Sequence, residues 1–210
     1  MQIRTEADPP PIVRIMATTL RRSARDSKLA ATLQKMRGVA ALKSATDPQA
    51  ATMRFGRGTV MIERGVAADV DVVVEADLAT MNDPNPPKPK VSGAARHPQF
   101  ALALGKVLEP PKESWSDAAR GYWEFAQGHP GMPTALEVVD TDSGERLVLG
   151  GGEPRVELHG SAHWLTVVLG GNSVLGEDIL AGKVQFVGAL QHLAVMTGRS
   201  IAWTLDGGFA

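Results

Sequence analysis

Cysteine is absent from the sequence, which excludes a disulfide scaffold, a thiolate nucleophile and a thiolate metal site. No apolar run is long enough to cross a bilayer, because the most apolar stretch, residues 164–169, ends at Gly170-Gly171. The first eight residues also lack the apolar segment of a secretory signal. We therefore expect a cytoplasmic protein.

The sequence also lacks an excess of positive or negative charge, because its net charge at pH 7 is −1. It therefore has no overall electrostatic attraction to nucleic acid. The distribution is uneven, however, because residues 1–64 hold twelve Lys and Arg against five Asp and Glu. Most of this basic excess lies on helical sequence, at Arg14, Arg21, Arg22, Arg25, Lys28, Lys35, Arg37 and Lys43. Two interpretations stay open: a solvated helix face, or a transient docking face for anionic membrane headgroups or for the phosphates of an acyl thioester.

The composition and length of the chain predict a globular protein with one large domain or two of ordinary size. A hydrophobic fraction of 43% beside 21% charged residues is typical of a folded chain. The 210 residues suffice for two domains of about 100 residues, each of which can bury its own core. Pro110-Pro111 marks the predicted boundary, so the domains are residues 1–110 and 111–210.

Hydrophobic periodicity and turn signals predict alternating helices and strands in both domains. In the first, helices are predicted at 12–20, 29–36 and 98–108, a brief helix at 76–81, an antiparallel meander at 39–45, 51–55, 59–63 and 70–74, and a last strand at 90–92. Four prolines predict a surface loop at 82–90. In the second, helices are predicted at 114–127, 161–169, 177–181 and 189–196, ending at Gly198, and strands at 135–139, 145–149, 155–158 and 183–187.

The two halves also align with one another at low identity, which indicates an internal repeat. The aligned pairs are Gly58 with Gly144, Val72 with Val156, and Gly93 with Gly188. The elements around these residues follow the same order in both halves.

At three points the first half resembles the SCP2-like (sterol carrier protein 2) family: residues 53–58 (MRFGRG), 69–78 (DVDVVVEADL) and 90–93 (KVSG) with the helix after it. In the second half, residues 139–146 and 156–162 resemble the SCP2-like C-terminal domain of the thiol-dependent maleylpyruvate isomerases. The resemblance covers roughly residues 28–108 and 134–198 and rests on patterns of apolar residues and glycines.

The resemblance implies an α+β fold of two tandem SCP2-like repeats, each a twisted antiparallel sheet packed against helices, arranged as a pseudo-dimer. It also implies a function, because such domains bind sterols, fatty acids or acyl thioesters in an apolar tunnel between sheet and helices and perform no chemistry. Two departures matter. The first half has the proline loop where the family has a longer helix, and the second half is one strand short before Ala135.

We therefore expect the ligand cavity in the second half. The residues expected to line it are Trp164, Leu165, Val168, Leu169, Leu175, Ile179, Phe186, Leu190, Leu193 and Met196. Plain core packing is the alternative for each of them, and the assignment to a ligand follows from the resemblance rather than from spacing.

No polar constellation in the sequence predicts catalysis. His159 and His163 have the spacing of a helical metal-binding pair, but Gly160 and Ser161 between them predict a strand end and a helix cap. The segment 140–145 has its glycine too early for a calcium loop and is better explained as a hairpin turn. We expect no enzymatic activity, no metal and no cofactor.

Two alternatives to an apolar-ligand carrier stay open. One is a dimerisation or interaction module whose cores are filled and take no ligand. The other is an accessory domain of a small-molecule enzyme system, which the isomerase resemblance suggests. The metal-binding helical bundle that carries the chemistry in those isomerases has no counterpart in this sequence.

Overall fold

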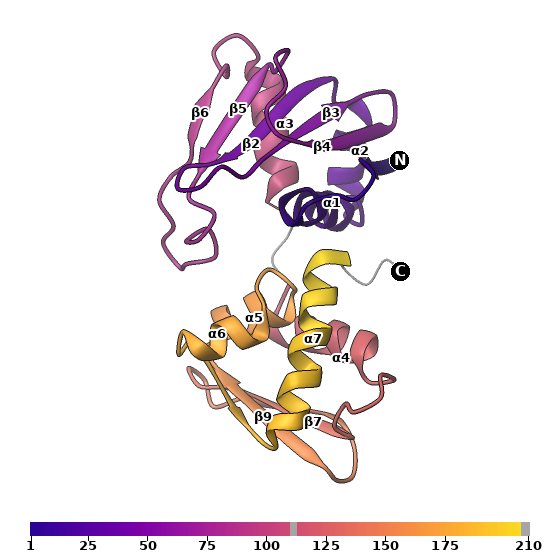
Figure 1. The fold of residues 1–210 in the computed structure, drawn as a ribbon, viewed down its shortest axis with the longest axis vertical. Coiled ribbons are helices and arrows are strands. Elements are labelled where there is room, and N and C mark those ends of the chain that lie inside the picture. The colour runs from indigo at the N-terminus through magenta and orange to yellow at the C-terminus, as the bar shows by residue number, and fades with distance from the viewer. Residues whose placement is uncertain (110–112, 207–210) are drawn as a thin grey trace. The chain divides into compact units, whose positions relative to one another are not determined.

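The computed structural model describes residues 1–109 and 113–206 (Figure 1). The chain separates into two compact units, Met1–Pro111 and Lys112–Ala210, called unit 1 and unit 2 below. Each unit packs helices against a β-sheet, so the predicted α+β class is confirmed. The predicted boundary at Pro110-Pro111 itself lies outside the described residues.

Unit 1 combines a six-stranded sheet with three helices in its described part. The helices are α1 (Pro11–Ser23), α2 (Ser27–Lys35) and α3 (Pro98–Leu108). The strands are β1 (Gln2–Thr5), β2 (Gly38–Ser44), β3 (Ala50–Phe55), β4 (Thr59–Arg64), β5 (Val72–Ala76) and β6 (Lys90–Ser92). Across the sheet their order is β1-β4-β3-β2-β5-β6.

This sheet is mixed, whereas the sequence predicted an antiparallel one. β2, β3 and β4 form the expected meander, but β5 crosses over and pairs in parallel with β2, with Val72 opposite Ala40. At the other edge of the sheet, β1 pairs in parallel with β4 and places Ile3 opposite Val60.

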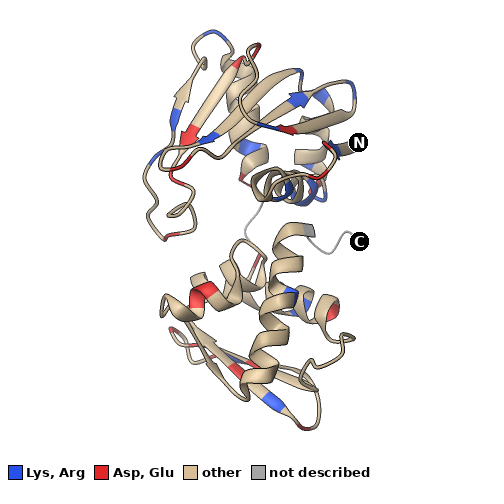
Figure 2. Cartoon of the chain, viewed as in Figure 1, with Lys and Arg blue, Asp and Glu red and all other residues tan. Residues whose placement is uncertain are grey.

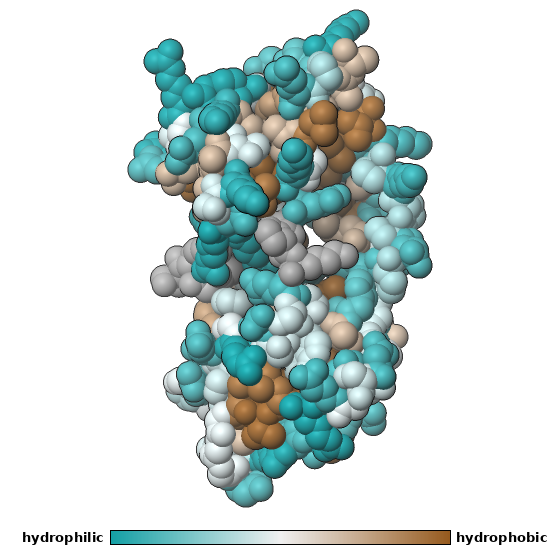
Figure 3. All heavy atoms as spheres, turned by 180° about the vertical axis from the view of Figure 1, so that it is seen from behind, coloured by the Kyte–Doolittle hydropathy of each residue, from teal (hydrophilic) through white to brown (hydrophobic). Residues whose placement is uncertain are grey.

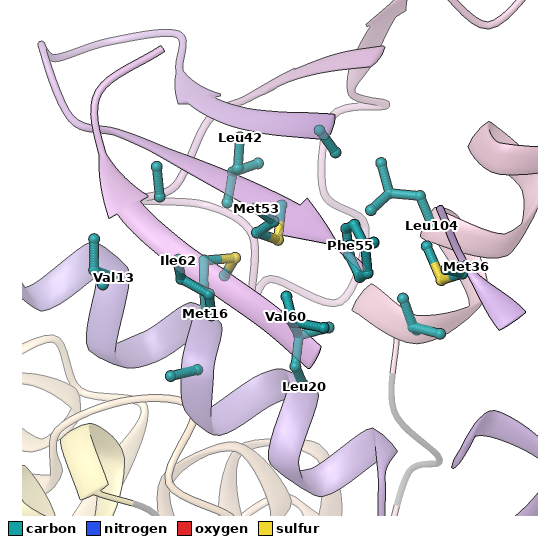
Figure 4. Close-up of a cluster of buried hydrophobic side chains, with 14 of the residues drawn as sticks. Val13, Met16, Leu20, Met36, Leu42, Met53, Phe55, Val60, Ile62 and Leu104 are labelled. Carbon is teal, nitrogen blue, oxygen red and sulfur yellow. The ribbon is translucent and has the colours of Figure 1, made fainter. Parts of the chain in front are cut away.

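Helix α1 supplies much of the core of unit 1. It begins at Pro11, and proline suits the first turn because its missing N–H needs no partner there. Figure 4 shows Met16 and Leu20 pointing from α1 toward Ile62 and Val60 of β4. Leu20 and Ile62 are completely buried, and burial of one such side chain stabilises the fold by roughly 1.5–3 kcal/mol.

The segment between β5 and β6 differs from the prediction in one respect. The prediction of a brief helix at 76–81 is wrong, because β5 extends to Ala76 and residues 78–82 form turns. The surface loop at 82–90 is confirmed, and all residues from Pro84 to Lys90 are exposed.

Unit 2 has a four-stranded sheet under four described helices. The helices are α4 (Trp115–Ala126), α5 (Ala162–Leu169), α6 (Leu175–Leu180) and α7 (Leu190–Asp206). The strands are β7 (Ala135–Asp140), β8 (Arg146–Gly150), β9 (Arg155–Gly160) and β10 (Val184–Val187), in the order β10-β9-β7-β8. This sheet is mixed too, because β7 and β9 run parallel.

Helix α7 continues past the predicted end at Gly198, so that boundary is wrong. Apolar contacts on both sides of the glycine hold the helix together. Met196 is completely buried in the core, and Trp203 packs on the same core while its indole N–H donates to the Leu169 carbonyl at 2.8 Å. These contacts outweigh the roughly 1 kcal/mol by which glycine weakens a helix.

The two sheets share one connectivity. Four neighbouring strands of each sheet correspond, namely β3-β2-β5-β6 in unit 1 and β8-β7-β9-β10 in unit 2. In both sets the first pair is antiparallel, the second parallel and the third antiparallel. Val72 and Val156 occupy the same place in this scheme, and Gly93 and Gly188 each follow the edge strand.

One aligned pair is wrong, namely Gly58 with Gly144. Gly58 lies in the turn from β3 to β4, whereas Gly144 lies in the turn from β7 to β8, which corresponds to the turn from β2 to β3. Within residues 113–206, the strand that unit 2 lacks is therefore the counterpart of β4, after β8, and not a strand before Ala135. Sequence comparison shifted by one strand because both turns carry a glycine with positive φ.

Charge separates strongly between the units, as Figure 2 shows for the described residues. Residues 1–111 hold sixteen Lys and Arg against eleven Asp and Glu, whereas residues 112–210 hold six against twelve. Among the described residues, no helix is both long and apolar enough to span a membrane.

Candidate functional site

The residues predicted to line a cavity lie in three different situations. Five are core residues with at most 1% exposure: Leu165, Val168, Leu169, Leu175 and Met196. Four are partly buried against that core: Trp164, Ile179, Phe186 and Leu193. Leu190 is 78% exposed. Together with residues of β7 and β9, the buried five fill the space between sheet and helices, and their contact with a ligand stays a prediction.

Ser161 caps helix α5, as predicted, because its hydroxyl accepts a hydrogen bond from the Trp164 N–H at 3.3 Å. The carboxylate of Asp140 also serves this end of the helix. It accepts hydrogen bonds from the Ser143 hydroxyl at 2.6 Å and from the backbone N–H groups of Asp142 and Ala162, which hold the pKa of Asp140 below its usual range. The Asp140 carboxylate thus occupies the N-terminus of α5. Residues 140–145 form the predicted hairpin turn.

An open depression of about 430 Å³ lies beside this helix end. Its lining residues are Thr141, His159, Gly160, Ser161, Trp164, Gly182, Lys183, Val184 and Gln185. Of the ten predicted residues, Trp164 lines this depression.

The charged groups around the depression are engaged with one another. The Lys183 ammonium lies 4.1 Å from the centre of a Trp164 ring and 3.5 Å from Oδ1 of the buried Asp178. Nε2 of His159 lies 2.8 Å from a carboxylate oxygen of Glu157. Because Lys183 and the imidazole of His159 each have a partner, the depression has a mixed polar and aromatic lining whose polar groups are already engaged within the chain.

The histidines do not form the metal pair that their spacing allows. His159 is in β9 and His163 is in α5, where its ring packs edge-on against Trp164 at 4.9 Å between centroids. Across residues 1–109 and 113–206, no group of three His, Cys, Asp or Glu is placed to hold a metal ion.

A second depression, of about 560 Å³ and also open, lies in unit 1 between α3 and the edge strand β6. Its lining is mostly apolar: Val91, Ala94, Pro98, Ala101, Leu102 and Gly105, with Lys106 and Glu109 at one end. We call it the α3 groove. Leu102 is 66% exposed and Val91 is 48% exposed. Figure 3 shows hydrophobic residues gathered at the surface of both units.

Comparison with known proteins gives two structural similarities. No protein family and no curated protein matches the chain. The crystal structure of a sterol carrier protein 2 matches with 18% identity and a TM-score of 0.35, over 45% of this chain and 90% of that one. The solution structure of a conserved hypothetical protein, TT1886, from Thermus thermophilus matches with 20% identity and a TM-score of 0.32, over 45% and 83% of the two chains.

Sequence reasoning missed the α3 groove, although one signal pointed to it. The helical periodicity of residues 98–108 places Phe100, Leu104, Val107 and Leu108 inward, which leaves Leu102 on the outer face. The structure buries Leu104 and Val107 and exposes Leu102. An apolar residue on the outer face of a helix, next to a short edge strand, is the pattern that would have indicated a surface groove.

Proposed function

We propose that this chain binds and carries an apolar small molecule, of the sterol, fatty acid or acyl thioester class, and performs no chemistry on it. The observation that carries the proposal is the α3 groove, an open depression with a mostly apolar lining. The resemblance of the sequence to the SCP2-like family supports the ligand class.

The exposed side chains of the groove support the same proposal. Leu102 on α3 is two-thirds exposed and Val91 on β6 is half-exposed. Exposure of these apolar side chains to water is unfavourable in free energy, and an apolar ligand that covered them would remove that penalty. Lys106 and Glu109 at one end could hold a polar head group, since both are exposed. An amphipathic ligand with one polar end therefore suits the groove.

The expected affinity is low. Burying about ten methylene groups contributes about 8 kcal/mol at roughly 0.8 kcal/mol each. Association costs at least about 4 kcal/mol, so the net free energy is about −4 kcal/mol, which corresponds to a Kd of about 1 mM. Such weak binding favours reversible carriage.

The interior of unit 2 is the second place where an apolar ligand could bind, as the sequence predicted. Leu165 and Met196 are completely buried there, so entry of a ligand requires α5 or α7 to move. Leu190 and Trp164 lie nearer the surface and would be met first.

The test is a titration of the full chain with an environment-sensitive fluorescent fatty acid, preceded by native mass spectrometry to find co-purified lipid. Gly105→Phe fills the α3 groove, because nothing lies within 4 Å of a Cβ placed at Gly105. Gly198→Phe is the matched control, since Gly198 is also an exposed helical glycine with nothing within 4 Å. Uptake should be lost in the first variant and retained in the second.

Two leucine variants report on the location of the site. Leu102→Asp places a charge in the groove and should abolish uptake, because an unpaired buried charge costs several kcal/mol, comparable to the net binding energy. Leu190→Asp does the same at the surface of unit 2. If the intact chain takes up no probe, the carrier proposal fails. If uptake is lost with Leu190→Asp but kept with Leu102→Asp, the site is in unit 2.

We also propose that the exposed basic residues of α2 and of the segments on either side of it contact anionic membrane surfaces transiently. Arg25, Lys28, Lys35 and Arg37 are exposed, and each basic residue near an anionic surface contributes about 1 kcal/mol. Co-sedimentation with phosphatidylserine vesicles should fall when salt rises and when Lys28 and Lys35 are both changed to Glu. Equal binding to neutral and anionic vesicles would contradict this proposal.

A further inference from the structure

The outer edge of β8 is open in unit 2 at a place where unit 1 has a further strand. In unit 1, β3 is covered by β4 from Ala51, opposite Arg64, to Phe55, opposite Val60. In unit 2, β8 has the same place in the shared connectivity, but within the described residues the sheet ends there.

The burial of corresponding residues shows what the missing strand leaves uncovered. When β2 and β7 are aligned through their parallel partners, Ala51 corresponds to Leu147 and Met53 to Leu149. Ala51 and Met53 are completely buried, whereas Leu147 and Leu149 are partly exposed. Val148, on the other face, is 51% exposed. The edge strand thus carries three consecutive apolar residues that no strand covers.

The backbone of β8 is also ready to accept a strand. Asp140 donates its N–H to the Glu145 carbonyl, and Gly151 donates to Thr134, so these are hydrogen-bonded pairs of the β7–β8 ladder. Because bonded pairs alternate along an antiparallel ladder, Leu147 and Leu149 bond to β7, and Val148 directs its N–H and carbonyl outward. An edge without proline or lysine is a template for pairing with another chain.

We propose that β8 pairs antiparallel with β8 of a second copy of this chain, with Val148 opposite Val148 of the partner subunit. In this register, Leu147 lies opposite the partner's Leu149, so apolar residues meet on the core side. Arg146 lies opposite the partner's Gly150, so no like charges oppose each other. This pairing is two-fold symmetric, and such isologous contacts close without forming fibres. The strand's own sequence therefore fits a copy of itself.

Sedimentation equilibrium of the full chain tests the proposal, and the expected species is a dimer. Val148→Lys and Val148→Glu each place like charges opposite one another and should raise the dimer Kd at least about tenfold. An equimolar mixture of the two variants should restore dimers, because opposite charges then face each other. Val148→Pro should also give monomers, since it removes the outward N–H and leaves the bonds to β7 intact.

The control is Val187→Lys. Val187 lies on the same face of the same sheet, in the opposite edge strand β10, and is 46% exposed. This variant should remain a dimer. An intact chain that is monomeric at high concentration overturns the proposal, as does a dimer that Val148→Lys leaves unchanged or that Val187→Lys dissociates. These readouts are independent of fatty acid uptake, which tests the α3 groove.

Discussion

Truncation of Leu165 distinguishes a packed interior in unit 2 from a ligand cavity. Leu165 has 0% exposure and lies in the core next to Gly160, where an added Cβ would lie 3.5 Å from the leucine side chain. In a packed interior, Leu→Ala leaves a hole, and such substitutions cost about 2.7–5.0 kcal/mol depending on how far the hole collapses. For a leucine that already faces an empty cavity, the loss is nearer its transfer free energy of about 2 kcal/mol.

We expect a loss of about 4 kcal/mol for Leu165→Ala, because Leu165 belongs to a buried cluster that also takes side chains from α4, α7, β7 and β9. Urea unfolding followed by tryptophan fluorescence measures this loss in unit 2 specifically. All four tryptophans, Trp115, Trp123, Trp164 and Trp203, lie in residues 112–210. At an m-value of about 1–3 kcal/mol/M, the midpoint should fall by more than about 1 M.

The control is Leu180→Ala, since Leu180 is 91% exposed and its truncation should change stability by no more than about 0.5 kcal/mol. A loss below about 2 kcal/mol for Leu165→Ala would refute the packed interior. It would favour a cavity lined by the residues predicted from the sequence.

Three further predictions test individual features of the fold. Gly93→Ala should unfold unit 1 at ordinary temperature, because φ is +85° and an added Cβ would overlap the Asp71 carbonyl oxygen. Its control is Gly65→Ala, where φ is +80° but the space is open. This control should lower the free energy of unfolding by about 1–2 kcal/mol in circular dichroism melting. Tyr122→Phe removes a buried hydrogen bond of 2.8 Å to a carbonyl of α7 and should cost about 1 kcal/mol in the fluorescence-detected transition. The folded-state pKa of Asp140 is lowered, so the stabilisation by its carboxylate is present at neutral pH and is lost as the pH falls through that pKa. The difference in the free energy of unfolding between the intact chain and Asp140→Asn should therefore disappear below about pH 4. A difference that does not change with pH would contradict this prediction.

The elements of this protein could be predicted because their signals are local. Apolar spacing on residues 98–108 and 161–169 is a helix signal wherever the segment lies in the fold. Ser161 and Pro11 act on the backbone within one turn, so the starts of α5 and α1 follow from neighbours in the chain. Gly198 was misread for the same reason, since its local preference is overridden by contacts that Trp203 makes with a distant segment.

The sheet order could not be predicted, because it depends on which strands become neighbours in three dimensions: β5 and β9 each return to the first strand of the preceding meander or hairpin and not to its last strand. β1 has a single apolar residue packed on the core, Ile3, and gives no strand periodicity. Yet β1 takes one edge of the meander, and β5 pairs at the other edge. The correspondence of the two units was shifted by one strand for the same reason, since alignment of turns does not reveal which strands are neighbours.

The apolar residues of the candidate site show the same division. By itself, the sequence determined that Leu102, Leu165 and Leu190 are helical. It also determined that the chain has two consecutive segments, each containing both helices and strands. Only the tertiary structure decided that Leu165 is completely buried, that Leu102 borders an open groove and that Leu190 faces water. The physical reason is that helical periodicity defines a face, whereas exposure depends on what other elements pack against that face.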